Sequence, residues 1–233
     1  MLLFFFIGSV LLSASILLSP GRLVTRVLSL VFSALLIALT VYAWIHQGKT
    51  ELAYFTFDST AVLLLSVLAL LTVPTLYHGF KYTRRDNLKT YNIYHSALTA
   101  LITFMAGAYL ANTMTVLWIF VEATTLAVAV LIYHDRTEIA LEATWKYIFI
   151  CSTGIALAYL GILFLGFIYG TGEAPNLSFS SFSLVIAGAD PLYLKIAFVF
   201  VVVGFSTKMG LFPMHTVTID AHSVAPPPVS ALI

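Results

Sequence analysis

The sequence predicts an all-α polytopic membrane helix bundle, and three observations lead to that prediction. Apolar residues make up 61% of the 233 residues and charged residues only 9%, against about 25% in an ordinary soluble domain. The mean hydropathy is +1.01. The apolar residues form continuous, membrane-length runs rather than the alternating pattern of a barrel strand. We therefore expect about seven spans, the start of an eighth, and a broken helix after Lys208.

Hydropathy and turn signals place these spans in order along the chain. They fall at Leu2–Leu18, Val27–Trp44, Ala61–Tyr77, Tyr94–Ala111, Met114–Tyr133, Tyr147–Tyr169 and Leu192–Met209, and the run Val229–Ile233 resembles the start of a further helix. No basic segment precedes the N-terminal run, so we interpret it as a retained first span and not as a cleaved signal. We divide the chain into N-terminal membrane helices, residues 1–93, and a second segment, residues 94–233.

The basic residues fall mostly on one side of this arrangement. If the N-terminus lies outside, eight of the eleven Lys and Arg residues are in inner loops, Lys49 and Lys195 are near the outer side, and Lys208 is within a span. An excess of Lys and Arg marks the cytoplasmic side of a membrane protein. The sequence therefore predicts a multi-pass protein of the cell (inner) membrane with its N-terminus outside. Its most charged loop, KYTRRDNLKTYN, is either a topology anchor or a docking surface for a soluble partner.

Two ionisable side chains lie within apolar spans. Glu122 is in TVLWIFVEATTLAVAVLIY, and Lys208 is in LYLKIAFVFVVVGFSTKMGLFPMH. A charge at mid-membrane costs about 2.5–3.5 kcal/mol on insertion scales, so such residues usually serve function. The alternatives are a Glu that bonds to a neighbouring helix and a Lys that extends to the membrane surface. The pattern predicts a protein that moves ions or belongs to an assembly that does.

Helix-breaking residues follow Lys208 directly. Gly210, Pro213 and the triplet Pro226–Pro228 predict that the helix breaks there. Freed backbone groups at membrane depth are tolerated where they are buried in protein or line a water-filled cavity. A lysine beside such a break has access to water and can exchange a proton.

Lys146 has two interpretations. It pairs with Glu142, one helical turn back, as an ordinary surface ion pair. Alternatively it faces the bundle and lies between Glu122 and Lys208 in a charge relay.

The polar residues after the predicted break also have two interpretations. His215, Asp220 and His222 form either a proton entry route or an exposed inner loop. Their spacing fits no standard zinc motif, and we expect no metal site. The sequence has no Walker loop, dinucleotide glycine fingerprint, CxxC pair or haem-type histidine pair, so we expect no catalytic residue, no cofactor and no active site in this chain.

Three segments carry a family resemblance. WIFVEATTLAVAVLIYH, LEATWKYIFICSTGIALAYLGILFL and FSTKMGLFPMHTVTIDAHSVAPPPVSALI resemble the antiporter-like proton-translocating membrane subunits, in this order and spacing. That family includes the large antiporter-like subunits of complex I, the membrane subunits of membrane-bound hydrogenases, and the large subunits of multisubunit Na⁺/H⁺ antiporters. The resemblance covers about Tyr94–Ile233 and is closest to the hydrogenase-type branch.

The resemblance assigns roles to individual positions. It implies that Glu122 is the family's intramembrane Glu, that Lys208 is its pumping Lys on a broken helix, and that Lys146 stands at a commonly basic position. His215 and the segment containing Asp220 match the stretch that connects the broken helix to the next one.

Two departures from the family pattern stand out. Family members usually read Trp-Leu-Pro-Asp up to the position of Asp220, where this chain has Val217, Thr218 and Ile219. Family members also have two inverted repeats, and this chain resembles only the N-terminal half, ending where the last helix of the first repeat begins.

The resemblance implies an ion-translocating membrane subunit, for protons or sodium, of a redox-driven complex I-like or membrane-bound hydrogenase-type complex. The chain would be a non-redox subunit of an oxidoreductase complex, with other membrane subunits and peripheral redox subunits as partners. Iron–sulfur clusters and NiFe or flavin/quinone are expected in those partners. The alternatives are a subunit of a multisubunit Na⁺/H⁺ antiporter without redox chemistry and a structural half-subunit scaffold.

Overall fold

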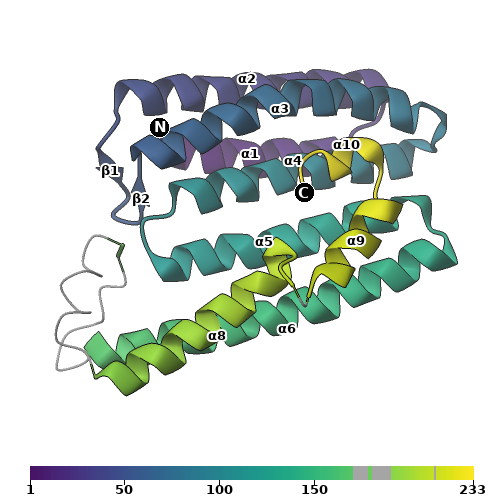
Figure 1. Ribbon diagram of the computed structural model, residues 1–233. Helices are drawn as coiled ribbons and strands as arrows, with labels where there is room; N and C mark the ends of the chain where they lie inside the picture. Colours follow the sequence, from purple (N-terminus) through teal and green to yellow (C-terminus); the bar gives the residue numbers. More distant parts are fainter. Residues whose placement is uncertain (170–177, 180–189, 213) are drawn as a thin grey trace.

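A computed structural model describes residues 1–169, 178–179, 190–212 and 214–233. They form an up-and-down arrangement of helices (Figure 1). The helices are α1 (Leu2–Leu17), α2 (Arg22–Ile45), α3 (Ser59–Tyr82), α4 (Leu88–Leu110), α5 (Met114–Ile132), α6 (Glu138–Tyr169), α8 (Pro191–Met209), α9 (His215–Val224) and α10 (Pro227–Ser230). Short 3₁₀ turns, η1 (Thr83–Arg85) and η2 (Tyr133–Asp135), follow α3 and α5, and strands β1 (Thr50–Glu51) and β2 (Phe55–Thr56) pair antiparallel. The predicted all-α membrane class is confirmed.

Six helices in the described part of the chain are long and apolar enough to cross a membrane: α2, α3, α4, α5, α6 and α8. The remaining predicted span, α1, is apolar but has only 16 residues. The sequence placed the start of α6 too late, at Tyr147. The helix begins at Glu138, because the Thr137 hydroxyl accepts a hydrogen bond from the Ala140 amide and starts the first turn ahead of the apolar run.

The run expected to open a further helix, Val229–Ile233, was also placed too late. The helical turn α10 begins at Pro227, whose fixed φ suits the first position of a helix, and it ends at Ser230.

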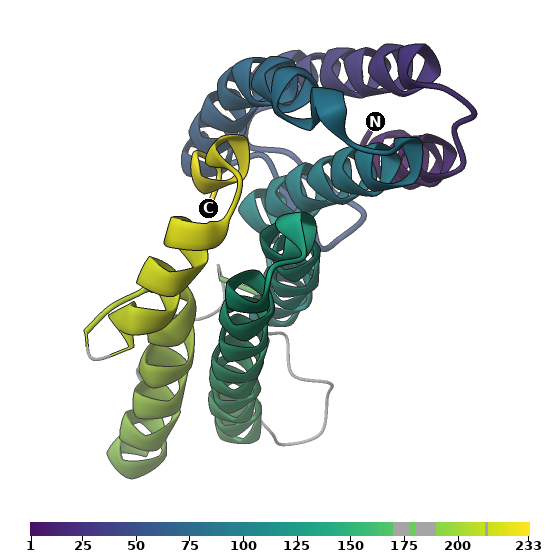
Figure 2. The same ribbon diagram turned by 90° about the vertical axis from the view of Figure 1, so that its right-hand side faces the viewer.

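The helices pack in two layers. Figure 2 shows α1 to α4 grouped in one layer and α5, α6 and α8 in the second, with α9 and α10 reaching back from the second layer to the first. α4 is the most buried of the six spans and contacts α1, α3 and α5. One continuous core includes Leu36 of α2, Leu101 of α4, Val128 of α5 and Val229 of α10. The boundary at residue 93 therefore does not separate two cores, and the division into repeats stays a prediction.

Polar residues at the loop ends fix where three helices begin. Asp58 accepts a hydrogen bond from the Ala61 amide at the start of α3, and Thr113 accepts one from the Val116 amide at the start of α5. Asp190 does the same for the Leu192 amide at the start of α8. Each cap satisfies an amide that the helix itself cannot pair, so these polar residues set the register of the apolar runs that follow.

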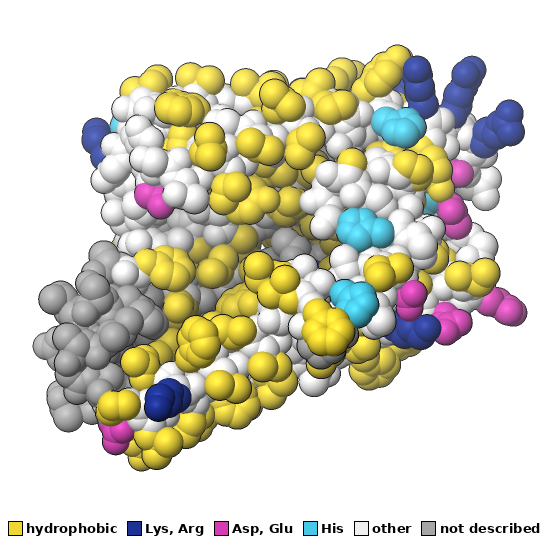
Figure 3. Space-filling view, viewed as in Figure 1, with side chains coloured by type: hydrophobic (Ala, Val, Ile, Leu, Met, Phe, Trp, Pro, Cys, Tyr) yellow, Lys and Arg dark blue, Asp and Glu magenta, His cyan; other side chains and the backbone are white. Residues whose placement is uncertain are grey.

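Lys and Arg side chains gather at one end of the molecule (Figure 3). The α1–α2 loop, the α3–α4 turn and the α5–α6 turn lie at this end, with Arg22, Arg84, Arg85, Lys89 and Arg136. We call it the basic end. Lys49 and Lys195 belong to the opposite end, in the α2–α3 loop and the first turns of α8. The positive-inside rule predicts that the basic end faces the cytoplasm.

Glycines let α6 and α8 approach closely, as small residues do in membrane helix pairs. A Cβ on Gly204 of α8 would lie 2.5 Å from the backbone nitrogen of Ala158 and 2.5 Å from the backbone oxygen of Gly154, both on α6. A Cβ on Gly154 would lie 2.0 Å from the Thr207 hydroxyl. This close packing holds the end of α8, and therefore Lys208, against α6.

Gly204→Ala is expected to destabilise the protein, because the new methyl meets backbone atoms that cannot move without displacing α8. Overpacking of this kind costs about 1–3 kcal/mol. Thermal unfolding of the detergent-solubilised protein measures the effect. Gly21→Ala is the matched control, since nothing lies within 4 Å of a Cβ at that position. Equal melting temperatures for the two variants would show that α6 and α8 do not pack as described.

Candidate functional site

Lys208 lies in the last turn of α8, beside the predicted break. The helix ends at Met209, and Gly210 follows in the left-handed conformation with φ +65°. The Gly210 amide donates to the Ser206 carbonyl, and α9 begins at His215. The broken helix is confirmed. Pro213, the second predicted breaker, lies outside the described residues.

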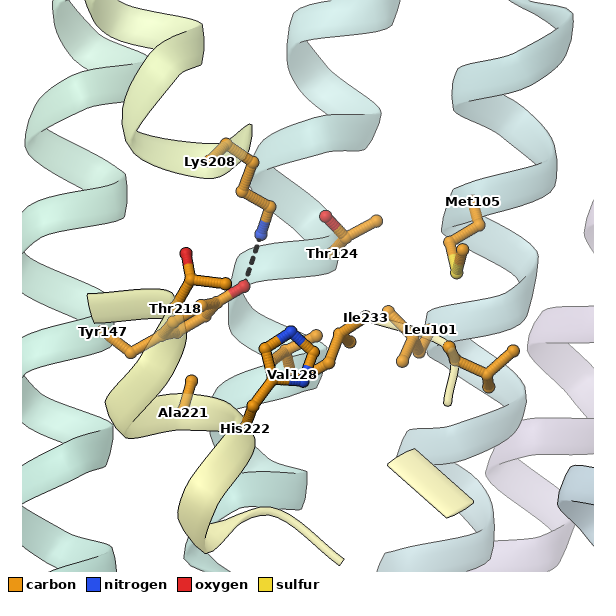
Figure 4. Close-up of a pocket in the computed structure, with 11 residues that line it drawn as sticks. Leu101, Met105, Thr124, Val128, Tyr147, Lys208, Thr218, Ala221, His222 and Ile233 are labelled. Carbon is orange, nitrogen blue, oxygen red and sulfur yellow. Dashed lines mark hydrogen bonds between the residues drawn. The ribbon is translucent and has the colours of Figure 1, made fainter. Parts of the chain in front are cut away.

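Two hydroxyl groups hold the Lys208 ammonium. The Nζ donates to the Thr125 Oγ1 of α5 at 3.0 Å and to the Tyr147 hydroxyl of α6 at 2.7 Å. The Tyr147 contact is the dashed line in Figure 4. The Nζ also lies 5.0 Å from the centroid of the Tyr147 ring. Within the described part of the chain, no carboxylate pairs with Lys208. The ammonium therefore sits among neutral oxygens with a third donor to spare.

A cavity of about 100 Å³ adjoins the Lys208 side chain, with room for water. Figure 4 shows α9 closing one side of it with Thr218, Ala221 and His222. The complete lining is Leu101, Met105, Thr124, Val128, Tyr147, Lys208, Thr218, Ala221, His222, Leu232 and Ile233. Because the lining is mostly apolar, its few polar groups define where water or a proton can bind.

Glu122 does not contact Lys208 directly. Its Oε1 accepts a hydrogen bond from the Ser152 hydroxyl of α6 at 2.8 Å. Its Oε2 is buried and has no hydrogen-bond partner among the described residues. Glu122 lies three residues before Thr125 on α5, a rise of about 4.5 Å on one helix face. The carboxylate and the ammonium are therefore neighbours along the contact between α5 and α6.

The structure places Lys146 on the surface, and its ion pairs in the described residues involve neither Glu122 nor Lys208. Its Nζ lies 2.7 Å from the Glu142 carboxylate and 3.5 Å from the Asp220 carboxylate, and its side chain is 48% exposed. The Glu142 pair is the surface alternative that the sequence left open. The Asp220 contact additionally ties α6 to α9.

The residues after the break separate into two groups. His222 lines the Lys208 cavity, whereas His215 and Asp220 do not. The His215 ring stacks on Phe212 with centroids 5.8 Å apart, and its buried Nδ1 has no hydrogen-bond partner in the described ranges. Val217, Thr218 and Ile219, which depart from the family pattern, lie within the regular ten-residue helix α9.

Sequence reasoning missed the hydroxyl groups of this site. Thr125, Tyr147 and Ser152 bond the two charged groups, yet Thr, Tyr and Ser in apolar helices are ordinary residues. The sequence did offer one signal, because Thr125 lies three residues after Glu122 and therefore on the same face of the helix. The described residues contain no group of three or more His, Cys, Asp or Glu side chains that could hold a metal ion.

These features define an integral, multi-pass membrane protein with a lysine at a broken helix, α8, and a partly buried glutamate on α5. Residues 111–233 match the family described as "NADH:quinone oxidoreductase/Mrp antiporter, TM". Because the match covers more than half of the chain, the chain belongs to this family.

Known relatives support this membership. The chain is 37% identical over 145 residues to the "Hydrogenase-4 component F homolog" of Methylacidiphilum infernorum (isolate V4), covering 60% of this chain and 30% of that protein. It is 29% identical over 217 residues to the "NADH-quinone oxidoreductase subunit N 2" of Aquifex aeolicus (strain VF5), covering 91% of this chain and 42% of the relative. The expected resemblance is confirmed.

A solved structure has the same fold. A chain of the membrane-bound sulfane sulfur reductase, described as an archaeal respiratory membrane complex, superposes with a TM-score of 0.85 at 18% identity. The match covers 98% of this chain and 49% of that one. The chain thus spans less than half the length of each of these three proteins.

Proposed function

We propose that this chain is an ion-translocating membrane subunit of a redox-driven complex, of the complex I-like or membrane-bound hydrogenase type. The observation that carries the proposal is the Lys208 ammonium, held by two neutral hydroxyls beside a cavity at a helix break. A permanent structural charge would more often be neutralised by a carboxylate. Residues 94–233 form the first antiporter-like repeat in this proposal, and residues 1–93 are its N-terminal membrane helices.

The proposed mechanism couples Lys208 to Glu122 through electrostatics. A proton enters from the basic end and binds the Lys208 amine. An ionised Glu122 favours the charged lysine, and a change in the charge of Glu122 or in its surroundings favours release. A neighbouring subunit that alters Glu122 can therefore bias Lys208, which is coupling between two sites through one two-state element.

The α9 residues have different parts in this proposal. His222 lines the cavity, whereas His215 and Asp220 do not. His222 is therefore better placed than those two candidates to donate a proton to Lys208. The Lys146–Asp220 contact holds α9 against α6, so both residues act on the cavity through the position of that helix.

The driving reaction takes place in other subunits. We place iron–sulfur clusters and NiFe or flavin/quinone in peripheral partners, with further membrane subunits beside this chain. The names of the relatives support this, since one is a hydrogenase component homologue and another an NADH-quinone oxidoreductase subunit. The second candidate, a Na⁺/H⁺ antiporter subunit without redox chemistry, is supported by the antiporters that the family description includes.

The test begins with the native complex extracted in mild detergent. Mass spectrometry identifies the partners, and reconstitution into liposomes with an internal pH-sensitive dye measures ion movement with and without Na⁺. Redox subunits together with redox-driven acidification support the proposal. Proton movement driven only by a Na⁺ gradient, without redox subunits, would establish the antiporter function instead. Assembly of the complex without any ion movement would instead support the structural scaffold alternative.

Tyr147→Phe is expected to slow translocation about tenfold without abolishing it. The variant keeps the ring under Lys208 but removes one of its two hydrogen bonds, and a hydrogen bond to a charged group contributes about 1.5–3 kcal/mol. Initial rates in the liposome assay measure the effect. Tyr193→Phe, at an exposed tyrosine near the start of α8, is the matched control. Equal rates for both variants would exclude a role for the Tyr147 hydroxyl.

A further inference from the structure

The basic end carries positive charge that its carboxylates do not neutralise. Within the described ranges, no ion pair is formed by any of six cations, which are Arg22, Arg26, Lys81, Arg84, Arg85 and Lys89. The acidic side chains of the adjoining turns are bonded to other groups. The Asp86 Oδ2 lies 3.0 Å from the His134 Nε2, and the Asp135 carboxylate accepts from the Tyr82 hydroxyl at 3.0 and 3.2 Å.

Arg22 has a structural role among these cations. Its guanidinium donates to the backbone carbonyls of Arg84, at 2.6 Å, and of Asp86. These bonds tie the start of α2 to the α3–α4 turn. The side chains that remain for an external partner therefore include Arg26 and Lys81, which lie on the flank of the bundle and not in its loops.

Arg26 of α2 and Lys81 of α3 each lie over an aromatic ring of α3. The Arg26 Cζ is 5.8 Å from the centroid of Phe80, and the Lys81 Nζ is 4.7 Å from the centroid of Tyr77. Residues three apart are neighbours on a helix surface, so Tyr77 and Phe80 bring the two cations to the same part of α3.

The Arg26 guanidinium has donors to spare. Its Nε donates to the Tyr91 hydroxyl at 3.4 Å, and its two terminal nitrogens have no acceptor in the part of the chain that the structure describes. Arg26 and Lys81 are both exposed. Together they offer a guanidinium edge and an ammonium to an anion at the surface.

An apolar surface lies directly below these cations. One turn deeper are Leu30 on α2 and Tyr77 on α3, and Val73 follows a further turn along α3; each is at least half exposed. The two helices pack side by side (Figure 1). Hydrophobic side chains extend along this region up to the Lys and Arg side chains of the basic end (Figure 3). The exposed flank of a spanning helix faces acyl chains, so this surface is cationic at the headgroup level and apolar beneath it.

We propose that Arg26 and Lys81 bind the headgroup phosphate of an anionic phospholipid whose acyl chains lie along α2 and α3. Arginine presents paired donors that fit phosphate oxygens, and lysine adds a point charge. Basic residues beside the cytoplasmic ends of spans attract anionic lipids. This proposal goes beyond the proposed function, because it does not depend on ion movement.

A lipid fits this surface better than the acidic face of a soluble partner. Such a partner would meet the cations beyond the ends of α2 and α3, which are Arg84 and Arg85 in η1 and Lys89 in the first turn of α4. It would leave the apolar strip below Arg26 and Lys81 uncovered. A phospholipid occupies both the cationic and the apolar part.

Native mass spectrometry of the detergent-solubilised protein tests the site with two probes, phosphatidylglycerol and phosphatidylcholine of the same acyl chains. We expect tighter retention of phosphatidylglycerol. Each cation near an anionic headgroup contributes about fivefold to binding, so the double variant Arg26→Gln/Lys81→Gln is expected to bind phosphatidylglycerol about twentyfold more weakly. The matched control Lys49→Gln/Lys195→Gln removes the same charge at the opposite end and is expected to bind normally.

Four results would overturn the proposal. Equal retention of the two lipids by the unaltered protein would leave these cations as a topology anchor. Unchanged phosphatidylglycerol binding in Arg26→Gln/Lys81→Gln would exclude the two residues. Displacement of the lipid by inorganic phosphate would indicate a site for the free ion. Loss of a soluble subunit from the native complex of that variant, with its phosphatidylglycerol retained, would establish a protein docking surface instead.

Two further measurements separate charge from folding. Arg26→Lys/Lys81→Arg keeps both charges and is expected to retain phosphatidylglycerol; loss equal to that of the glutamine variant would contradict a charge-based site. In the unaltered protein, added phosphatidylglycerol is expected to raise the melting temperature, as any ligand of the folded state does. This rise should shrink between about 0.1 and 1 M NaCl, where the screening length falls from about 10 to about 3 Å. A rise that is independent of salt, or no rise at all, would overturn the site even where the variants do not fold.

Discussion

Lys208→Met is expected to reduce ion translocation to the level of protein-free liposomes while the protein keeps its fold. Methionine has a similar length and no charge, so it fills the space of the lysine stem without an ammonium that can bind or release a proton. The two hydrogen bonds to Thr125 and Tyr147 are lost with the charge. Proton uptake and thermal unfolding, measured on the same preparation, give the two readouts.

Stability distinguishes a functional lysine from a structural one. A lysine at mid-membrane costs about 2.5–3.5 kcal/mol, so its removal is expected to leave the melting temperature unchanged or to raise it. If Lys208 instead holds α8 to α5 and α6, the variant melts earlier and the complex fails to assemble. Lys195→Met, an exposed change at the other end of α8, is the matched control and is expected to alter neither readout. A normal rate of ion translocation by Lys208→Met would contradict the proposed mechanism.

The sequence predicted those parts of the site that depend on a charged residue in an apolar helix or on a glycine that ends a helix. A charge in an apolar run and a glycine after it are visible without any structure, and Lys208 and Gly210 lie at the helix break as expected. The boundaries of α6 were harder to place, because Glu138 to Lys146 form helical turns that hydropathy assigns to a loop. Hydropathy reports which residues suit lipid, whereas the helix itself continues for as long as its backbone hydrogen bonds do.

The sequence alone could not predict the direction in which the side chains of the site point. Lys146 could point outward or into the bundle, and only the packing of α6 against α9 decides that it meets Glu142 and Asp220. In the same way, His222 and not His215 lines the cavity, because α9 is a regular helix and residues seven apart face nearly the same side but at different depths. The hydroxyls that hold Lys208 come from two helices far apart in the sequence.

The geometry also bears on the form that the proposed coupling takes. A direct ion pair between Glu122 and Lys208 would need the two groups within about 4 Å of each other. The structure instead gives each its own hydroxyl partners, Ser152 for Glu122 and Tyr147 for Lys208, on the same helix α6. A movement of α6 relative to α5 would change both sets of contacts together. In the proposed mechanism, the two charges would therefore respond together without a direct contact.

Glu122→Gln is expected to reduce translocation at least about tenfold while preserving assembly. The substitution keeps the shape of the side chain and an oxygen that accepts from Ser152, so its main effect is to remove the charge. Loss of that charge removes a Coulomb interaction with Lys208 across one turn of α5, which is stronger in a low-dielectric interior than in water. Proton uptake by the reconstituted complex measures the result, with partner composition checked by mass spectrometry.

The environment of Glu122 makes the stability outcome informative as well. Its Oε2 is buried without a hydrogen-bond partner among the described residues, and a buried charge is costly unless it is paired. Neutralisation should therefore leave the thermal stability unchanged or increase it. Ser152→Ala is the matched control: it removes the one hydrogen bond but keeps the charge, and we expect only a small loss of rate. If Glu122→Gln and Ser152→Ala both destabilised the protein, the role of Glu122 would be to hold α5 against α6 through its hydrogen bond to Ser152. That result would contradict the proposed coupling between Glu122 and Lys208.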